Sequence, residues 1–319
     1  MELKQLSQKW ALLDVGKVGI QSIRLNSETI PDLFIGINIE GYRNLILKLP
    51  SGYVADFQSS TKQNLSLELY TETKWVVLTL LDVQYSDLFD DLIYSIYYKV
   101  RQMLEPKAYI SEFLLTYYKW SEFFQDNRGD TLSDETIRGL LGELIYLHEQ
   151  IKECKATELN DMLNSWKGPY DTGHDFIGEF KNTEVKTKTI SSSGILISSE
   201  YQLETEPNKE LDLLIVTIES DTEGITLKEL VMMIRETIGL KLGDFGIVIT
   251  ALLQKGITML NLDTYDHLRY TPIEMSFYNV EESSFPKLIR SELNEGISSV
   301  KYKINIQTIA SYLTNKIEF

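Results

Sequence analysis

The sequence predicts a mixed α/β protein with two parts, a β-rich N-terminal domain of residues 1–128 and a second α/β domain of residues 129–319. Short apolar runs separated by turn residues fill the chain up to about residue 85. Amphipathic helical patterns follow, and a near-continuous apolar run at 211–219 is typical of a central strand covered on both faces. A chain of 319 residues is long enough for two such domains.

The N-terminal domain is predicted to be a set of short strands followed by two helices. Apolar residues at four-residue spacing predict a helix over 86–103, which ends before Pro106. A second helix, rich in aromatic residues, is expected over 110–124, and the polar stretch 125–130 is the predicted linker. Examples of the expected strands are 33–40, 45–49, 65–70 and 75–81.

The second domain is predicted to open with a helix that extends to about residue 153. Ser133 is the expected N-cap because its hydroxyl can accept a backbone N–H, and the acids Asp134 and Glu135 follow in the first turn. Glu143 lies at the edge of the apolar stripe, so its carboxylate can reach a cleft while its stem stays packed. Beyond residue 190, strands are expected at 194–198, 211–219, 258–262, 273–280 and 300–306, and helices at 227–238, 246–253 and 308–315.

The segment 174–187, with the sequence HDFIGEFKNTEVKT, carries the chemistry. In an extended strand Glu184 and Lys186 point to one face and Val185 to the other. If the segment forms a hairpin, Asp175 can lie across from Glu184, with Cβ atoms about 4.5–5.5 Å apart. A turn at 181–183 would instead separate these two acids. Two carboxylates that close repel each other unless a hard cation lies between them, so the pattern is typical of a metal-dependent site for phosphodiester cleavage.

The spacing alone fits a solvated hairpin with outward charges better than it fits a site. Its context favours the site, because a capped helix with Glu143 precedes the segment and a buried strand follows it. His174 is expected to be a turn residue that could line the site, and His148 is expected to be a core residue.

These residues resemble the bacterial PD-(D/E)XK motif proteins, a group related to restriction endonucleases. The resemblance extends from about residue 130 to the end of the chain, and His174 stands where the motif has proline. It rests on Glu143 and on the segments WKGP at 166–169, HDF at 174–176, EVKT at 184–187, ISS at 197–199, FP at 285–286 and GISSVKY at 296–302.

The resemblance implies a restriction-endonuclease-like core, in which helices flank a mixed central sheet, with a C-terminal extension of strand and helix. It implies Mg²⁺-dependent cleavage of double-stranded DNA in restriction-modification or phage defence, with Mn²⁺ as a substitute ion. Asp175 and Glu184 would be metal ligands together with the Val185 carbonyl. Lys186 would be the catalytic lysine, and Glu143 the helix acid that completes the site.

The net charge of −16 counts against a general nucleic-acid binder, because affinity for the backbone comes mainly from Lys and Arg. Three interpretations therefore stay open: an endonuclease, a non-catalytic subunit that keeps the fold and binds partners, and a nuclease active only with partner subunits. The expected partners are DNA, proteins of a restriction or defence system, and a second copy in a homodimer. The sequence shows neither a signal peptide nor a membrane span, and its single cysteine, Cys154, fits a reducing cytoplasm.

Overall fold

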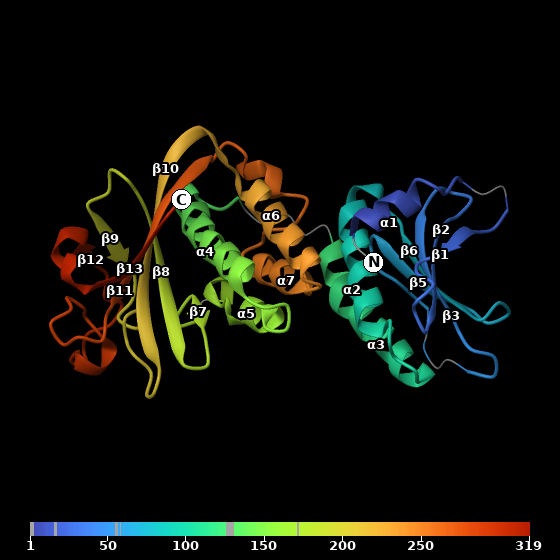
Figure 1. Ribbon diagram of the computed structural model, residues 1–319, viewed down its shortest axis with the longest axis horizontal. Helices are drawn as coiled ribbons and strands as arrows, with labels where there is room; N and C mark the ends of the chain where they lie inside the picture. The colour runs from blue at the N-terminus through green and yellow to red at the C-terminus, as the bar shows by residue number, and fades with distance from the viewer. Residues whose placement is uncertain (1–2, 16–17, 55–56, 58, 126–130, 171) are drawn as a thin grey trace. The chain divides into compact units, whose positions relative to one another are not determined.

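The computed structural model describes residues 3–15, 18–54, 57, 59–125, 131–170 and 172–319 of a mixed α/β protein. The chain forms two compact units (Figure 1). Unit 1 contains Met1–Arg128 with the later segments Asp244–Thr250 and Thr258–Leu260, and unit 2 contains the rest. The predicted linker at 125–130 lies almost entirely outside the described residues, so the domain boundary at 128 stays a prediction.

Unit 1 is built on a six-stranded antiparallel sheet with the strand order β1-β2-β3-β6-β5-β4. Helices α2 and α3 pack side by side along the sheet (Figure 1). The strands are β1 (Gln21–Arg24), β2 (Asp32–Ile37), β3 (Arg43–Lys48), β4 (Ser60–Thr61), β5 (Leu65–Tyr70) and β6 (Trp75–Leu80), and the helices are α1 (Leu3–Trp10), α2 (Ser86–Val100) and α3 (Pro106–Ser121). The four predicted strands and both predicted helices are present.

Unit 2 contains a five-stranded mixed sheet with the order β13-β11-β10-β8-β7, in which β8 and β10 are parallel and the other pairs are antiparallel. Strand β10 is central, as its apolar sequence predicted. The strands are β7 (Phe176–Ile177), β8 (Lys181–Thr189), β9 (Gly194–Ile197), β10 (Glu210–Ile225), β11 (Tyr270–Asn279), β12 (Tyr302–Asn305) and β13 (Leu313–Glu318). The helices are α4 (Asp134–Glu153), α5 (Leu159–Ser165) and α6 (Leu227–Leu240), and α7 (Gly246–Gln254) has residues in both units.

Helix α4 covers one face of this sheet, and α6 packs on α4 (Figure 1). Ser133 caps α4 as predicted, because its side chain accepts a hydrogen bond from the Thr136 N–H at 3.2 Å. At the other end, the Lys241 ammonium donates to the carbonyls of Ile151, Lys152 and Cys154 at 2.6–2.7 Å. These contacts satisfy carbonyls that the helix end leaves without partners, so both ends of α4 are held.

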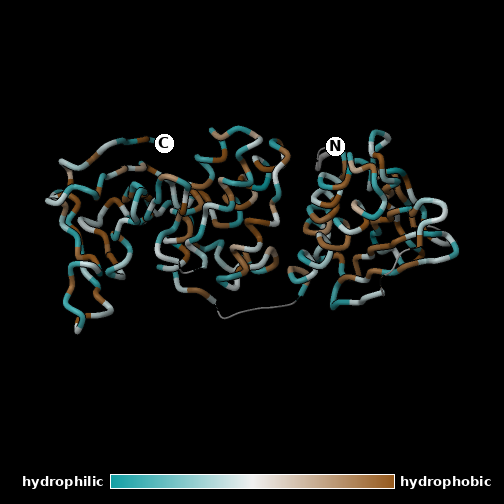
Figure 2. The backbone as a smooth tube through the Cα atoms, turned by 90° about the horizontal axis from the view of Figure 1, so that it is seen from below, coloured by the Kyte–Doolittle hydropathy of each residue, from teal (hydrophilic) through white to brown (hydrophobic). Residues whose placement is uncertain are grey.

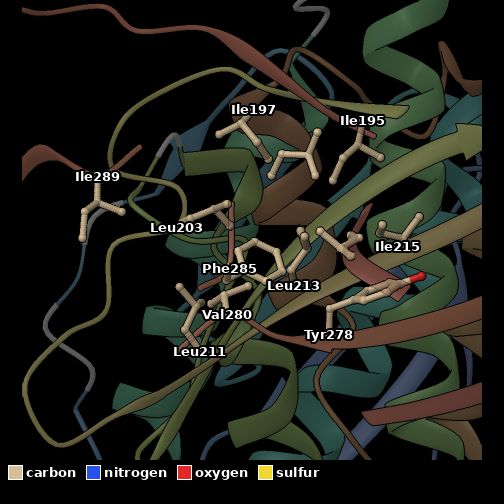
Figure 3. Close-up of a cluster of buried hydrophobic side chains, with 12 residues drawn as sticks. Ile195, Ile197, Leu203, Leu211, Leu213, Ile215, Tyr278, Val280, Phe285 and Ile289 are labelled. Carbon is tan, nitrogen blue, oxygen red and sulfur yellow. The ribbon is translucent and has the colours of Figure 1, made fainter. Parts of the chain in front are cut away.

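An apolar cluster covers the other face of the sheet. Side chains of β10, among them Leu211, Leu213 and Ile215, pack against Ile195 and Ile197 of β9 (Figure 3). Strand β9 pairs with β12 in a separate two-stranded sheet. The chain connects the parallel strands β8 and β10 through strand β9 and loops. Parallel strands are more often connected by an α-helix. Hydrophobic and hydrophilic residues alternate along the backbone of both units (Figure 2).

Two predicted elements are wrong. Residues 258–262 form a turn that leads into a 3₁₀ helix at Leu262–Tyr265, and no described strand pairs with them. The predicted helix at 308–315 is a 3₁₀ helix over Ile306–Tyr312 followed by β13, which pairs with the edge of β11. In both places tertiary packing decides the backbone, because an apolar run this short fits several conformations.

Five of the described helices and strands, α1, β1, β4, α5 and β13, were not predicted. Helix α3 begins at Pro106, four residues before its predicted start, because proline is well tolerated in a first helical turn. No helix in the described part of the chain is both long and apolar enough to cross a membrane.

Candidate active site

The hairpin of β7 and β8 places Asp175 next to Glu184. Its turn lies at 178–180, where the Gly178 N–H donates to the Lys181 carbonyl at 3.0 Å. Phe176 pairs with Thr183, so the next position along the register joins Asp175 and Glu184. The alternative turn at 181–183 is therefore wrong.

Asp175 is fixed through both its backbone and its side chain. Its carbonyl accepts hydrogen bonds from the N–H groups of Lys167 and Gly168 at 2.6 and 3.0 Å. Its carboxylate oxygen Oδ2 accepts the Val185 N–H at 2.8 Å. In a strand the N–H and C=O of one residue face the same edge, so the Val185 carbonyl also faces the edge where Asp175 lies.

Glu184 and Lys186 form a buried ion pair, with 2.7 Å between Oε1 and Nζ. They lie on the face of β8 that carries Leu213 and Ile215 on the neighbouring strand, as strand alternation predicted. Their side chains are only 1% and 14% exposed, which excludes the solvated hairpin. Burial by itself lowers the pKa of Lys186, but Glu184, Asp175 and Glu143 together raise it above its ordinary value.

His174 is a buried neighbour of Glu184 and not an exposed turn residue. It is 4% exposed, and its Nδ1 lies 3.9 Å from Glu184 Oε2. In the described part of the chain this nitrogen has no hydrogen-bond partner. The structure therefore supports the expectation that His174 lines the site and does not support the expectation of a turn residue at the surface. His148 is a core residue as expected, and burial lowers its pKa.

Glu143 reaches the site from α4. The indole N–H of Trp166 donates to its Oε2 at 2.7 Å. A Cβ atom on Gly168 would lie 2.1 Å from Glu143 Oε2 and 3.0 Å from Asp175 Oδ1, so both carboxylates converge on the space that this glycine leaves open. From the sequence alone, neither Trp166 nor Gly168 could be assigned a role of its own. Their only signal was the segment WKGP, which shows no chemistry until the fold brings it to Glu143.

Burial and mutual repulsion make these acids hard to ionise. Burial, and then the charge of Glu184, raise the pKa of Glu143 to about 7, although the Trp166 hydrogen bond and Lys186 oppose this. Burial, Glu184 and Glu143 raise the pKa of Asp175 well above its ordinary value. A cluster of this kind gains stability from any added positive charge.

The donor set fits a magnesium ion. All its atoms are oxygens, which hard cations prefer, and Mg²⁺ keeps several waters while it takes one or two carboxylates. Within the described residues no three Asp, Glu, His or Cys side chains are already arranged to hold a metal. Glu143 and Asp175 form the prearranged pair, whereas Glu184 is held by Lys186.

Carboxylates that gather beside a lysine on a mixed sheet define a candidate site for a divalent cation and a phosphate. The family model described as "Putative PD-(D/E)XK family member, (DUF4420)" matches residues 5–307. The chain belongs to this family, which confirms the resemblance and implies a restriction-endonuclease-like fold. Nucleases of the PD-(D/E)XK type typically use divalent metals. No curated protein and no solved structure matches the chain.

Proposed function

We propose that the chain is a divalent-metal-dependent endodeoxyribonuclease that hydrolyses phosphodiester bonds in double-stranded DNA. The observation that carries this proposal is that the buried Glu184 and the partly buried Glu143 and Asp175 gather around Lys186. Buried carboxylates that repel each other destabilise a fold, and a binding scaffold has no physical need for them. A site that holds a cation and a phosphate does need them.

In this proposal Asp175, Glu184 and the Val185 carbonyl would hold Mg²⁺, or Mn²⁺ in its place, and Glu143 would hold a metal-held water or a second ion. Such an ion would supply a water of lowered pKa and positive charge opposite the phosphate. Lys186 orients the attacking water and stabilises the negative charge of the pentavalent transition state. Trp166 and the Val185 N–H hold one oxygen each of Glu143 and Asp175, which fixes the direction of both carboxylates.

A second function, that of a non-catalytic subunit in a defence complex, is favoured by the net charge of −16. A nuclease that is active only with partner subunits would combine both features. The role in restriction-modification or phage defence, the protein partners and the homodimer belong to this proposal through the sequence resemblance alone.

Cleavage of supercoiled plasmid with Mg²⁺ or Mn²⁺ tests the proposal. Methylated and unmethylated DNA would be compared for the native chain, Asp175→Ala, Lys186→Ala and the control Asp161→Ala, which removes an exposed acid of α5. We expect the native chain and the control to cut and the other two variants to be inactive. Cutting that survives in Asp175→Ala and Lys186→Ala would overturn the assignment of the site.

Calorimetric titration with Mn²⁺ separates the two functions if the native chain does not cut. A nuclease that requires partners still binds the metal, and Asp175→Ala abolishes this binding while Asp161→Ala does not. A native chain that binds no Mn²⁺ at the site would favour the non-catalytic subunit.

A further inference from the structure

Glu143 and Asp175 line a cleft of about 340 Å³, and three basic side chains line the same cleft. They are Arg138 of α4, Lys186 of β8 and Lys255, which follows α7. Three acids, Glu135, Glu143 and Asp175, line the cleft as well, so its formal charges balance although the whole chain carries −16. The cleft is therefore less negative than the chain as a whole, at the position where the proposed reaction would occur.

Arg138 is the informative member of the three. Its Nε atom is buried and has no hydrogen-bond partner, and no hydrogen bond or ion pair joins its guanidinium to any other described residue. Glu135, on the same helix, also lines the cleft, yet it does not pair with Arg138 in the described structure. A buried guanidinium N–H without an acceptor costs free energy, and an anion in the cleft would supply the acceptor.

The other two cations, Lys186 and Lys255, differ in the acids with which they interact. Lys186 is bound to Glu184 at 2.7 Å, so its charge is already compensated within the site. Lys255 lines the cleft together with Glu143, and its charge lowers the pKa of that acid. Arg138 and Lys255 thus lie on two different segments that line one cleft together with Glu143 and Asp175.

We propose that this cleft binds a backbone phosphate of a nucleic acid strand, with the Arg138 guanidinium and the Lys255 ammonium as its cationic contacts. The inference rests on the proposed function for the nature of the polymer. Guanidinium binds phosphate through paired N–H donors, whereas an ammonium acts as a point charge. Both are substrate-binding groups here, and neither takes part in bond breaking.

The proposal accounts for how an acidic chain can hold an acidic polymer. Affinity for nucleic acid comes from the few cations that neutralise phosphates, not from the net charge of the whole protein. Two cations beside the acids would hold the strand so that a phosphate lies near Asp175 and Glu143. Repulsion by the remaining surface would then limit binding to this cleft.

Binding of a fluorescein-labelled DNA duplex in EDTA, measured by anisotropy over a range of salt concentrations, tests the proposal without any cleavage. The variants are Arg138→Gln, Lys255→Gln and the control Lys155→Gln, which removes an exposed cation that pairs with Glu158 outside the cleft. We expect Arg138→Gln and Lys255→Gln each to weaken binding about tenfold or more. Each should also reduce the slope of log K against log salt by about 0.9, because one fewer phosphate is neutralised.

The charge-keeping variant Arg138→Lys should retain the native salt slope while it loses part of the affinity, which a merely structural role of Arg138 would not produce. Thermal unfolding of every variant checks that the fold is intact. Competition with inorganic phosphate distinguishes a site for free phosphate from a site for the polymer. Inorganic phosphate at the same concentration as the phosphate groups of the duplex would displace the duplex only from a site for free phosphate.

The outcomes separate this inference from the nuclease proposal. Native binding whose affinity and salt slope are unchanged in Arg138→Gln and Lys255→Gln would overturn the inference even if the chain cuts DNA. No native binding at low salt, or block by free phosphate alone, would also overturn it. Binding that behaves as expected in a chain that never cuts would support the inference while the nuclease proposal fails.

Discussion

At the scale of single residues, Glu143 has the property that is hardest to explain without a function. Its pKa of about 7 lies above the value of 4.5 that it has in the unfolded chain, because it is buried and close to Glu184. The folded chain therefore holds the Glu143 proton more tightly than the unfolded chain does. It follows that the stability of the metal-free protein falls as pH rises from about 4.5 to about 7, and the whole penalty applies above pH 7.

Replacement Glu143→Gln tests this dependence, since the amide oxygen can still accept the Trp166 N–H. We expect the variant to be more stable than the native chain above pH 7, by a few kcal/mol at most, at about 1.4 kcal/mol per pKa unit. The difference should shrink as pH falls and vanish below about pH 4.5, where the native carboxyl is neutral as well. Urea unfolding in EDTA across this range measures it, and parallel pH profiles for both proteins would contradict it.

Trp166 is the residue that makes the buried Glu143 tolerable. In Trp166→Phe the ring still packs but the hydrogen bond of 2.7 Å is lost, so the pKa of Glu143 should rise further. We expect a loss of about 1–3 kcal/mol for the unsatisfied carboxylate, in addition to the cost of the smaller ring, and this loss should grow with pH.

Trp120→Phe is the matched control for this prediction. The indole nitrogen of Trp120 is buried and has no hydrogen-bond partner in the part of the chain that the structure describes. Its replacement removes similar volume without removing a hydrogen bond, so its cost should not depend on pH. The idea fails if both variants show the same pH dependence in chemical unfolding.

At the scale of elements, helix α4 and strand β8 could be predicted, whereas the residues that reach the site from other segments could not. Ser133, the acids after it and the apolar stripe are local signals, and they predicted both the helix and the outward edge on which Glu143 lies. Strand alternation likewise predicted the shared face of Glu184 and Lys186. Trp166, Gly168, Arg138 and Lys255 meet these residues only through long-range packing, which no local pattern encodes.

The contact between α4 and β8 depends on Gly142. A Cβ atom there would lie 1.9 Å from Thr187 Oγ1 and 3.1 Å from Thr187 Cβ, and a β-branched side chain cannot turn fully away. We therefore expect Gly142→Ala to push α4 off the strand and to cost about 1–3 kcal/mol in the free energy of unfolding. Because Glu143 is the next residue, affinity for Mn²⁺ should fall as well.

Gly139→Ala is the control on the same helix, since a Cβ atom at Gly139 would meet nothing within 4 Å. Alanine is the better helix former, so this variant should be as stable as the native chain or more stable by up to about 1 kcal/mol. The double variant Gly142→Ala, Thr187→Ala should recover part of the lost stability. Equal stability of Gly142→Ala and Gly139→Ala in thermal unfolding would show that the close approach is not required.

At the scale of the whole molecule, sequence order and spatial grouping differ. The sequence predicted two successive domains, whereas unit 1 also takes in Asp244–Thr250 and Thr258–Leu260 from far along the chain. Such a grouping has no local signature, because the residues that meet are more than a hundred positions apart. Within unit 1, the Asp244 carboxylate lies 3.5 Å from Ser95 Oγ and 3.7 Å from Lys99 Nζ.

Unit 1 should therefore be incomplete when it is cut from the chain at residue 128. Trp120 is fully buried, and Gly246 approaches it so closely that a Cβ atom would lie 2.9 Å from the indole ring. We expect a fragment of residues 1–128 to unfold at a lower temperature alone than with an added peptide of residues 240–262, since ligands that bind only the folded state stabilise it. The same peptide with Gly246→Val should not stabilise the fragment, because its side chain would collide with Trp120. Thermal unfolding followed by circular dichroism, with each peptide in turn, measures the difference. If the fragment unfolds at the same temperature with no peptide, with the native peptide and with the variant peptide, residues 1–128 fold without the rest of the chain.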